Sequence, residues 1–318
     1  MPTHDQRERQ TDARLSLVTY AEAEQWIETF LEDQVSLSPE TLDTYHRKLK
    51  AFMDWWGSSY PERALTVQLA YALGTYRTDQ PGSLRTQALH LAVLKRWGSY
   101  LVKVGRLTHN PWTQVVTPRQ PVWLATDWLT LSEIKRLLNS FDRTRLSHQR
   151  DAIICRLMLK TAAREHELAV ADIKDVRMIG TEAWLFLKSK GKQKEEPVLL
   201  VKPLKEELDE YLRRRYPDGR IPEEAPLFTV YTDEEERRMP TREMRRRIAN
   251  ALKRAQITRA GITPLSLRHT AGKQALAKRA PLTAVQDMMR HESITTTRRL
   301  AEQEHRRTHA AERFLSHY

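Results

Sequence analysis

Arginine, histidine and lysine side chains that could bind a phosphodiester are concentrated in the second half of the sequence. Arg164 precedes Glu167 by three residues, and Arg268 is followed directly by His269. A guanidinium group is planar and permanently charged, so it can donate two parallel hydrogen bonds to two phosphate oxygens. Each motif also has a plain structural interpretation, because Arg164 can pair with Glu167 along one helical face and Arg268 can be a surface residue. The order of such motifs along the chain therefore matters more than any one of them.

A run of lysines lies between two short segments that are rich in apolar, β-prone side chains. These segments are residues 184–188 and 196–201, and the polar stretch between them predicts a β-hairpin. Its tip carries Lys190, Lys192 and Lys194. A solvated basic turn that contacts phosphates without doing chemistry is one interpretation of these lysines.

The overall composition points to a polyanionic partner. The chain has 318 residues and a formal net charge of +12, and clustered Lys and Arg bind nucleic acid by releasing the counterions of its phosphates. No stretch approaches the roughly 20 apolar residues of a membrane-spanning helix, and the start of the chain is too polar for a signal peptide. We therefore expect a cytoplasmic, nucleoid-associated protein that binds double-stranded DNA and no membrane. Cys155, the single cysteine, lies in an apolar run and is interpreted as a buried thiol.

Helical periodicity dominates the first hundred residues. Apolar side chains recur at three- and four-residue steps, Ser38 opens one helix, and another begins at Ser83 and ends at Gly105. We therefore predict a helical domain over residues 18–115. The polar residues 1–17 before it are interpreted either as an arm that contacts DNA or as an idle tail.

A linker separates this domain from a second one. Residues 116–126 contain prolines and few periodic apolar positions, which is typical of an extended connection between domains. In the second domain, residues 127–318, Thr130 and Glu133 are spaced as in a capped helix start. The apolar run 153–160 predicts the central helix of its core.

Basic side chains gather on two predicted helices. The helix over residues 241–256 has apolar residues on one face and basic residues on the other, and a helix of the first domain carries basic residues beside Trp97. The residues that we predict to face DNA are Arg85, Lys95, Arg96, Lys192, Arg242, Arg245, Arg246, Lys253 and His269. Solvated helix faces are the alternative, and the net charge favours DNA contact for at least one of the two groups. Trp97 itself is interpreted as core packing.

In their order along the chain, four motifs resemble the catalytic domain of the tyrosine recombinase family, also called the phage integrase family. They are residues 161–168 with Arg164, 189–199 with Lys190, 263–270 with Arg268, and 285–297 with His291. Residues 36–45 and 84–111 resemble the helical core-binding domain of the family, so the resemblance spans about residues 20 to 300. It implies a mainly α (α+β) fold, with an N-terminal helical, SAM-like core-binding domain and a C-terminal catalytic-like domain of mixed helices and a small β-hairpin or sheet.

The resemblance also implies a role for each matching residue. Arg164 and Arg268 would grip the scissile phosphate of DNA. His291 would help to hold that phosphate, and a histidine that merely closes a helix C-terminus is the alternative. Lys190 would protonate the leaving sugar oxygen, with Lys192 as one substitute, and a purely phosphate-contacting turn is the alternative. No metal ion or cofactor is implied.

Two positions depart from the pattern of the family. The family usually has a histidine three residues before Arg268, where this chain has Leu265, and a nucleophilic tyrosine nine residues after His291, where it has Leu300. A leucine side chain can neither donate a hydrogen bond nor attack phosphorus. The next tyrosine is Tyr318, 18 residues further along, and that stretch spans roughly 27 Å if it is helical. Tyr318 could therefore serve only if the chain folds back or if it acts in trans on a neighbouring subunit, and an ordinary aromatic chain end is the alternative.

Three functions remain open at this point. The chain keeps Arg164, Arg268 and His291 but lacks the histidine at position 265 and the tyrosine at position 300. This combination favours a DNA-binding protein that is catalytically inactive or impaired. It would clamp double-stranded DNA in a regulatory or architectural role, as a homo-oligomer or in association with an active recombinase. The alternative is an active site-specific recombinase with a displaced nucleophile such as Tyr318. A helical protein that uses its basic surface for protein or RNA is the third, and it predicts weak duplex binding with a shallow salt dependence.

Overall fold

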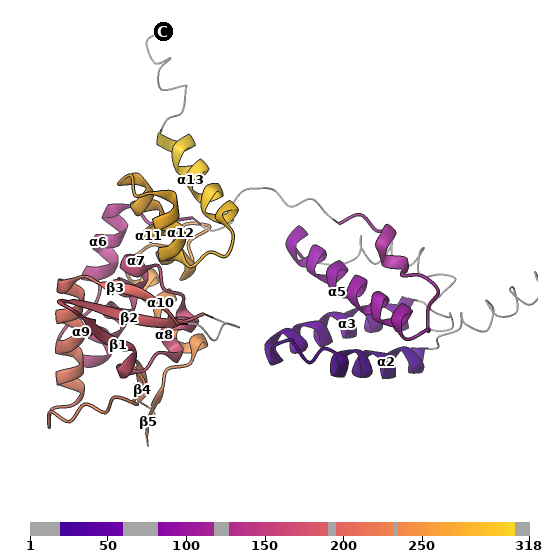
Figure 1. Ribbon diagram of the computed structural model, residues 1–318, viewed down its shortest axis with the longest axis horizontal. Helices are drawn as coiled ribbons and strands as arrows, with labels where there is room; N and C mark the ends of the chain where they lie inside the picture. Colours follow the sequence, from indigo (N-terminus) through magenta and orange to yellow (C-terminus); the bar gives the residue numbers. More distant parts are fainter. Residues whose placement is uncertain (1–19, 60–81, 118–126, 190–194, 232–234, 309–318) are drawn as a thin grey trace, which may run out of the picture. The chain divides into compact units, whose positions relative to one another are not determined.

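The computed structural model describes residues 20–59, 82–117, 127–189, 195–231 and 235–308. Its packing divides the chain into two units, residues 1–123 and 124–318 (Figure 1), which are described separately below. The predicted arm 1–17, the linker from residue 118 onward, Lys190, Lys192 and Tyr318 lie outside the described residues. The boundary between the units falls inside the stretch that the sequence predicts as a linker.

The first unit is built from helices around an aromatic core. Its elements are α2 (Tyr20–Asp33), α3 (Pro39–Ser59), α5 (Leu84–Lys103) and the short 3₁₀ helix η1 (Pro111–Gln114). Ser83 caps α5 by accepting a hydrogen bond from the backbone N–H of Thr86, as the sequence predicts. Trp97 and Trp112 are fully buried and pack against the ring of Phe52. The interpretation of Trp97 as core packing is therefore confirmed.

A close approach ties the end of this unit to α5. The side chain of Asn110 donates hydrogen bonds to the carbonyl of Lys95, 2.7 Å away, and to the hydroxyl of Ser99. A Cβ atom at Gly98 would lie 2.4 Å from the Asn110 side chain and 2.5 Å from the Trp112 ring. Glycine is required at position 98 because no side chain fits between α5 and η1.

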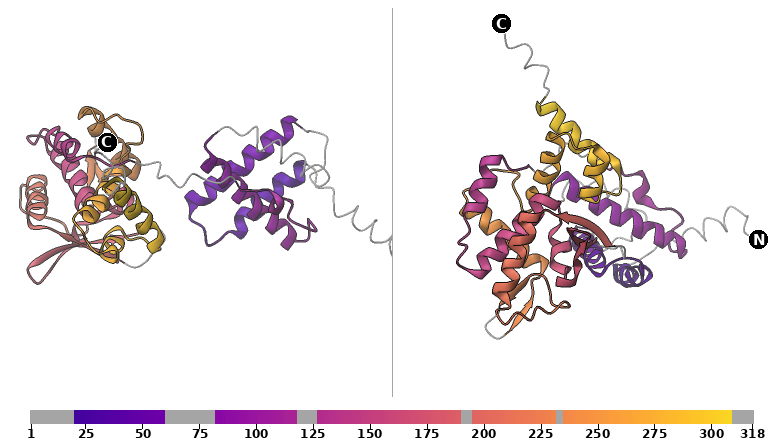
Figure 2. Two further views of the ribbon diagram at one scale, coloured as in Figure 1. Left: turned by 90° about the horizontal axis from the view of Figure 1, so that it is seen from above. Right: turned by 60° about the vertical axis from the view of Figure 1, so that its left-hand side comes forward.

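The second unit places helices around a small antiparallel sheet (Figures 1 and 2). Its elements are α6 (Leu131–Asn139), α7 (Leu146–Thr161), α8 (Glu165–Val170), η2 (Ile173–Asp175), β1 (Val176–Ile179), β2 (Glu182–Lys188), β3 (Glu195–Leu200), α9 (Lys202–Arg215), β4 (Thr229–Tyr231), β5 (Glu236–Arg238), α10 (Thr241–Arg254), α11 (Leu265–Ala277), α12 (Leu282–Met289) and α13 (Ile294–Thr308). The views agree in placing α11, α12 and α13 together at one end of this unit and β4 and β5 at the other.

The sheet extends the hairpin that the sequence predicts. β2 and β3 pair antiparallel, with Leu185 opposite Val198, and β1 adds a third strand beside β2. Buried and more exposed residues alternate along β2, as expected for a strand with one face on a core. The pair β4 and β5 was not predicted, because three-residue strands carry too short an alternation to be recognised.

Helix α7 forms the centre of the second core, as its apolar sequence predicts. Ile153, Ile154, Leu157 and Met158 are each at most 1% exposed. Cys155 is fully buried among them, and burial raises the pKa of its thiol far above the ordinary value.

Thr130 and Glu133 form the predicted capping box at the start of α6, each side chain accepting from the backbone N–H of the other. No helix in the described part of the chain combines the length and apolarity needed to cross a membrane.

Candidate phosphate-binding site

Arg164 lies where α7 ends and α8 begins. Ala162 ends α7 in the left-handed region, with φ of 52°, and Arg164 is the N-cap of α8. Its guanidinium contacts Glu167 at 2.5 Å, and its backbone N–H donates to the other oxygen of the same carboxylate at 2.7 Å. Glu167 is fully buried, whereas the Arg164 side chain is 37% exposed. The predicted pair with Glu167 exists, but it is anchored in the interior and leaves the arginine accessible to a ligand.

Arg268 is buried in the first turns of α11. Only 3% of the residue is exposed, and its guanidinium donates to the backbone carbonyls of Ala162 and Met289. The alternative that Arg268 is an ordinary surface residue is therefore wrong. Burial, followed by the positive charges of Arg164 and Arg290, lowers the pKa of Arg268 to about 9. Its two hydrogen-bond partners carry no charge, and the nearby carboxylates of Glu167 and Glu165 offset only part of this lowering of the pKa.

Arg290 and Glu167 form a buried ion pair at the centre of the site. Their closest atoms are 2.8 Å apart, and the two side chains are 1% and 0% exposed. Glu167 also accepts a hydrogen bond from the hydroxyl of Ser189, at the end of the described part of the hairpin. Burial opposes ionisation of Glu167, but the charges and hydrogen bonds of Arg290 and Arg164 outweigh burial and hold its pKa below the ordinary value. Sequence reasoning missed Arg290, although a cation at the end of a helix before His291 was a visible signal.

His291 follows Arg290, the C-cap of α12, and lies near the same cluster of arginines. Its backbone N–H donates to the carbonyl of Gln286, and its ring Nδ1 lies 2.9 Å from the hydroxyl of Thr297. The histidine does lie at the end of a helix, and its part in holding a phosphate remains a prediction. Burial, and then Arg268 and Arg164, lower its pKa to about 4, so the ring is neutral at pH 7.

His269 is next to Arg268 on α11 and is also neutral. Burial, and then Arg268 and Lys273, lower its pKa to about 4. Its Nδ1 atom is buried and finds no hydrogen-bond partner among the described residues. The predicted contact of His269 with DNA remains a prediction.

The two leucines occupy different environments. Leu265 is the first residue of α11 and is 37% exposed. Leu300 of α13 is 2% exposed and packs in a small apolar cluster with Ala271, Val285 and Met289. A Cβ atom at Gly272 would lie only 2.7 Å from Leu300, so α11 and α13 approach closely there. The expected position of the nucleophile is thus filled by an apolar side chain that joins two helices.

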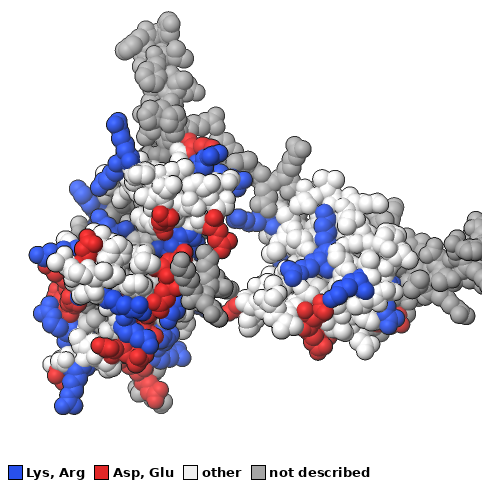
Figure 3. All heavy atoms as spheres, viewed as in Figure 1, with Lys and Arg blue, Asp and Glu red and all other residues white. Residues whose placement is uncertain are grey.

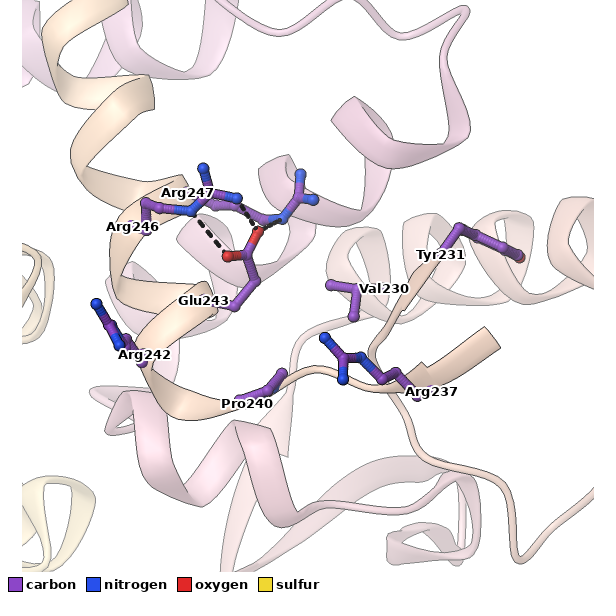
Figure 4. A pocket seen from close by; sticks show the side chains of 8 residues that line it. All are labelled: Val230, Tyr231, Arg237, Pro240, Arg242, Glu243, Arg246 and Arg247. Carbon is purple, nitrogen blue, oxygen red and sulfur yellow. Dashed lines mark hydrogen bonds and ion pairs between the residues drawn. The ribbon is translucent and has the colours of Figure 1, made fainter. Parts of the chain in front are cut away.

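The arginines of α10 border a cleft beside β4 and β5. The cleft has a volume of about 520 Å³, and Figure 4 shows Glu243 within it, bridging Arg246 and Arg247. The Arg246 guanidinium lies 2.7 Å from Glu243, and that of Arg245 lies 3.4 Å from Glu165. Arg242 and Lys253 have no carboxylate partner in the described part of the chain. Figure 3 shows Lys and Arg spread over one face of this unit with Asp and Glu among them.

Of the basic residues predicted in the first unit, Arg85 and Arg96 are exposed on α5 and Lys95 is partly buried there. Arg96 donates to the side chain of Gln34, 2.9 Å away, and its guanidinium lies over the ring of Tyr45. The roles of these three residues in DNA binding remain predictions. No cluster of His, Cys, Asp and Glu side chains suited to a metal ion occurs within the described ranges.

The histidines predict a loss of stability at mildly acidic pH. In the unfolded chain each protonates near 6.5, whereas His269 and His291 in the folded chain stay neutral down to a pKa of about 4. The unfolded chain therefore binds more protons between these values, and the free energy of unfolding falls as pH drops through 6.5 toward 4. Urea unfolding at pH 7.5 and pH 5 should show a smaller fall for the double variant His269→Gln/His291→Gln. His90 of the first unit, whose pKa is also lowered to about 4, contributes equally to both chains, so an equal fall contradicts this prediction.

The comparison with known proteins identifies the family. Residues 127–306 match the phage integrase family, which is more than half of the chain, so the chain belongs to that family of tyrosine recombinases. Tyrosine recombinase XerD of Listeria monocytogenes is 27% identical over 276 residues, covering 84% of this chain and 89% of the relative. Tyrosine recombinase XerC of Yersinia pestis is 27% identical over 270 residues, covering 84% and 86%. The resemblance read from the four motifs is confirmed.

Solved structures show the same fold. A lambda integrase dimer bound to a COC′ core site matches with a TM-score of 0.69 and 17% identity, covering 94% of this chain and 81% of that one. XerH site-specific recombinase in a post-cleavage complex with a palindromic difH substrate matches with a TM-score of 0.67 and 19% identity, covering 92% and 84%. At these identities the likeness concerns the fold alone, and it confirms the predicted fold class.

Proposed function

We propose that this chain is a non-catalytic DNA clamp that holds a phosphate of double-stranded DNA without cleaving the strand. One observation supports the proposal most. The residues that would bind the phosphate are all present, whereas positions 265 and 300, where the family has a histidine and a tyrosine, hold leucines. Arg164, Arg268 and His291 converge on the ends of α7 and α12. Leu300, at the expected position of the nucleophile, is buried in an apolar cluster.

The arginines and carboxylates of the site favour the binding of a DNA phosphate. Arg164 and Arg290 share the carboxylate of Glu167, and Glu165 is paired with Arg245. Arg268 donates to two uncharged carbonyls, so the cations outnumber the carboxylates around it. A phosphate with two accessible oxygens can accept hydrogen bonds from two guanidinium groups at once. With His269 and His291 neutral at pH 7, either ring can donate or accept one further hydrogen bond.

Cleavage in this family needs a tyrosine oxygen that attacks phosphorus and a proton donor for the leaving sugar oxygen. Leu300 supplies no nucleophile, and Leu265 supplies no hydrogen bond at the other altered position. The solved relatives named above are bound to DNA, one of them as a dimer, which supports duplex binding by an oligomer here. The role that we propose is regulatory or architectural, on the nucleoid, alone or beside an active recombinase.

The test is a search for a covalent protein–DNA adduct. The full chain is incubated with a duplex that it selects from a random-sequence pool, with a nick placed at each position in turn to trap cleavage. We expect stable binding and no adduct in denaturing gels. An adduct that disappears in the Tyr318→Phe variant would instead establish an active recombinase with a nucleophile supplied in trans. Weak binding with a shallow salt dependence would favour the protein- or RNA-binding alternative.

The α10 surface gives a second measurable expectation. Arg242 is exposed in the first turn of α10 and has no carboxylate partner among the residues described. If it contacts a phosphate, Arg242→Ala should weaken duplex binding and lower the slope of log affinity against log salt by about 1. Arg213→Ala, at an exposed arginine of α9, is the matched control and should leave the slope unchanged. Equal slopes for both variants contradict a role of α10 in phosphate contact.

A further inference from the structure

Arg290 is a buried arginine whose donors are all used within the protein. Its Nε donates to Glu167 at 3.3 Å, and its Nη2 donates to Glu167 at 2.8 Å and to the carbonyl of Ala162 at 2.9 Å. Its Nη1 donates to the carbonyls of Met288 and Thr161, at 2.8 and 3.4 Å. A guanidinium has five N–H groups, and these five contacts account for all of them. Arg290 therefore has no donor left for a ligand, and its effect on the site must be indirect.

The backbone of Arg290 is held in an uncommon conformation. Its φ is 50° and its ψ is 48°, the left-handed region in which glycine is the usual residue. The chain thus places a long charged side chain where a glycine would be less strained. Its contacts must compensate for that strain, because nothing in the local backbone favours an arginine there.

The contacts of Arg290 connect the separate parts of the phosphate-binding site. Ala162, which ends α7, accepts hydrogen bonds from both Arg268 and Arg290. Glu167 is shared between Arg290 and Arg164, and the carbonyl of Arg290 accepts from Arg164 at 3.3 Å. His291 is the next residue in the chain. Arg164, Arg268 and His291 are therefore each bonded to Arg290 or to one of its direct partners.

We propose that Arg290 is the positioning residue of this site, holding the two phosphate-binding arginines and His291 in the arrangement that receives a single DNA phosphate. The inference rests on the proposed function. It goes beyond that function because it assigns the arrangement of the phosphate-binding side chains to Arg290, which has no N–H group left to donate to DNA. Its buried charge also adds to the positive potential around Arg268, which makes a bound phosphate more favourable.

The test measures how strongly binding depends on each phosphate. In the duplex selected by the wild-type chain, every phosphate is replaced in turn by an uncharged methylphosphonate. We expect one replacement to weaken wild-type binding most, by at least about 10-fold, because it removes hydrogen bonds to buried cations. In Arg290→Gly the same replacement should cost less than about 3-fold, since displaced arginines act only as diffuse charges. A merely structural role would lower stability without changing this ratio.

The matched control is Arg279→Gly. Arg279 is also an arginine in the left-handed region, with φ of 60°, but it is exposed. The two variants therefore lose the same charge and gain the same backbone freedom. We expect that replacing the phosphate on which wild-type binding depends most will also weaken binding by Arg279→Gly by at least about 10-fold.

The outcomes separate the inference from the proposed function. If no single phosphate dominates binding of the wild-type chain, the proposed function fails and the inference fails with it. If one phosphate dominates and Arg290→Gly keeps the full dependence, only the inference is overturned. If Arg290→Gly does not fold at the assay temperature, Arg290→Lys decides the question, because lysine keeps the charge but cannot bridge Glu167 and three carbonyls. Loss of the dependence in Arg290→Lys supports the inference, and full retention overturns it.

Discussion

Replacing Arg268 with methionine is expected to weaken binding to the selected duplex by about 30-fold or more, the usual scale for removing a buried, hydrogen-bonded charge at an interface. The guanidinium of Arg268 is buried and, among the described residues, donates to two uncharged carbonyls and to no carboxylate, which is why we expect its charge to act on a bound phosphate. Methionine has a similar length and no charge. The affinity is measured by fluorescence anisotropy, and thermal unfolding of the same sample shows whether the variant is folded.

Stability should respond to this substitution only modestly. The carbonyl of Met289 loses its donor, which costs about 1–3 kcal/mol, whereas that of Ala162 keeps Arg290 as a donor. Removal of a buried charge offsets part of that cost. Arg268→Lys is the matched control, since it keeps the charge and loses the planar pair of donors, and we expect an intermediate affinity. A methionine variant that binds the duplex as tightly as wild type contradicts the assignment of Arg268 to the phosphate site.

Replacing Leu300 with alanine is expected to destabilise the second unit by about 2–5 kcal/mol. Leu300 is 2% exposed, and its side chain fills the space between Gly272, Val285 and Met289 where α13 meets α11 and α12. The smaller side chain leaves a cavity that the three helices cannot close without moving. Urea unfolding of the full chain, followed by circular dichroism, measures the change in free energy.

Leu300→Met distinguishes packing from chemistry at this position. Because methionine has nearly the same volume, it should cost less than about 1.5 kcal/mol. Both variants, when folded, should bind the selected duplex as the wild-type chain does, because Leu300 is not predicted to contact the phosphate. If Leu300→Ala unfolds at the same urea concentration as wild type, Leu300 is not the packing residue that the structure indicates.

The sequence by itself determined the features that depend on local spacing and on motif order. The capped starts at Ser83 and Thr130, the apolar run of α7 and the β-prone run of β2 are local patterns, and the structure has each of them. The four motifs in order identified the family, because each motif needs only the neighbouring residues to be recognised. Leu265 and Leu300 were visible as departures for the same reason.

Only the tertiary structure decided how these residues meet. Arg268 and Ala162, like Arg290 and Glu167, are more than a hundred residues apart in the chain, and their contacts depend on how α11 and α12 pack against the end of α7. Spacing along a helix cannot reveal such contacts, so the burial of Arg268, the sharing of Glu167 and the part played by Arg290 were not predicted. The packing of Leu300 is of the same kind. The local sequence named the residues of the site, and long-range packing determined which of them are buried, charged and close enough to act together.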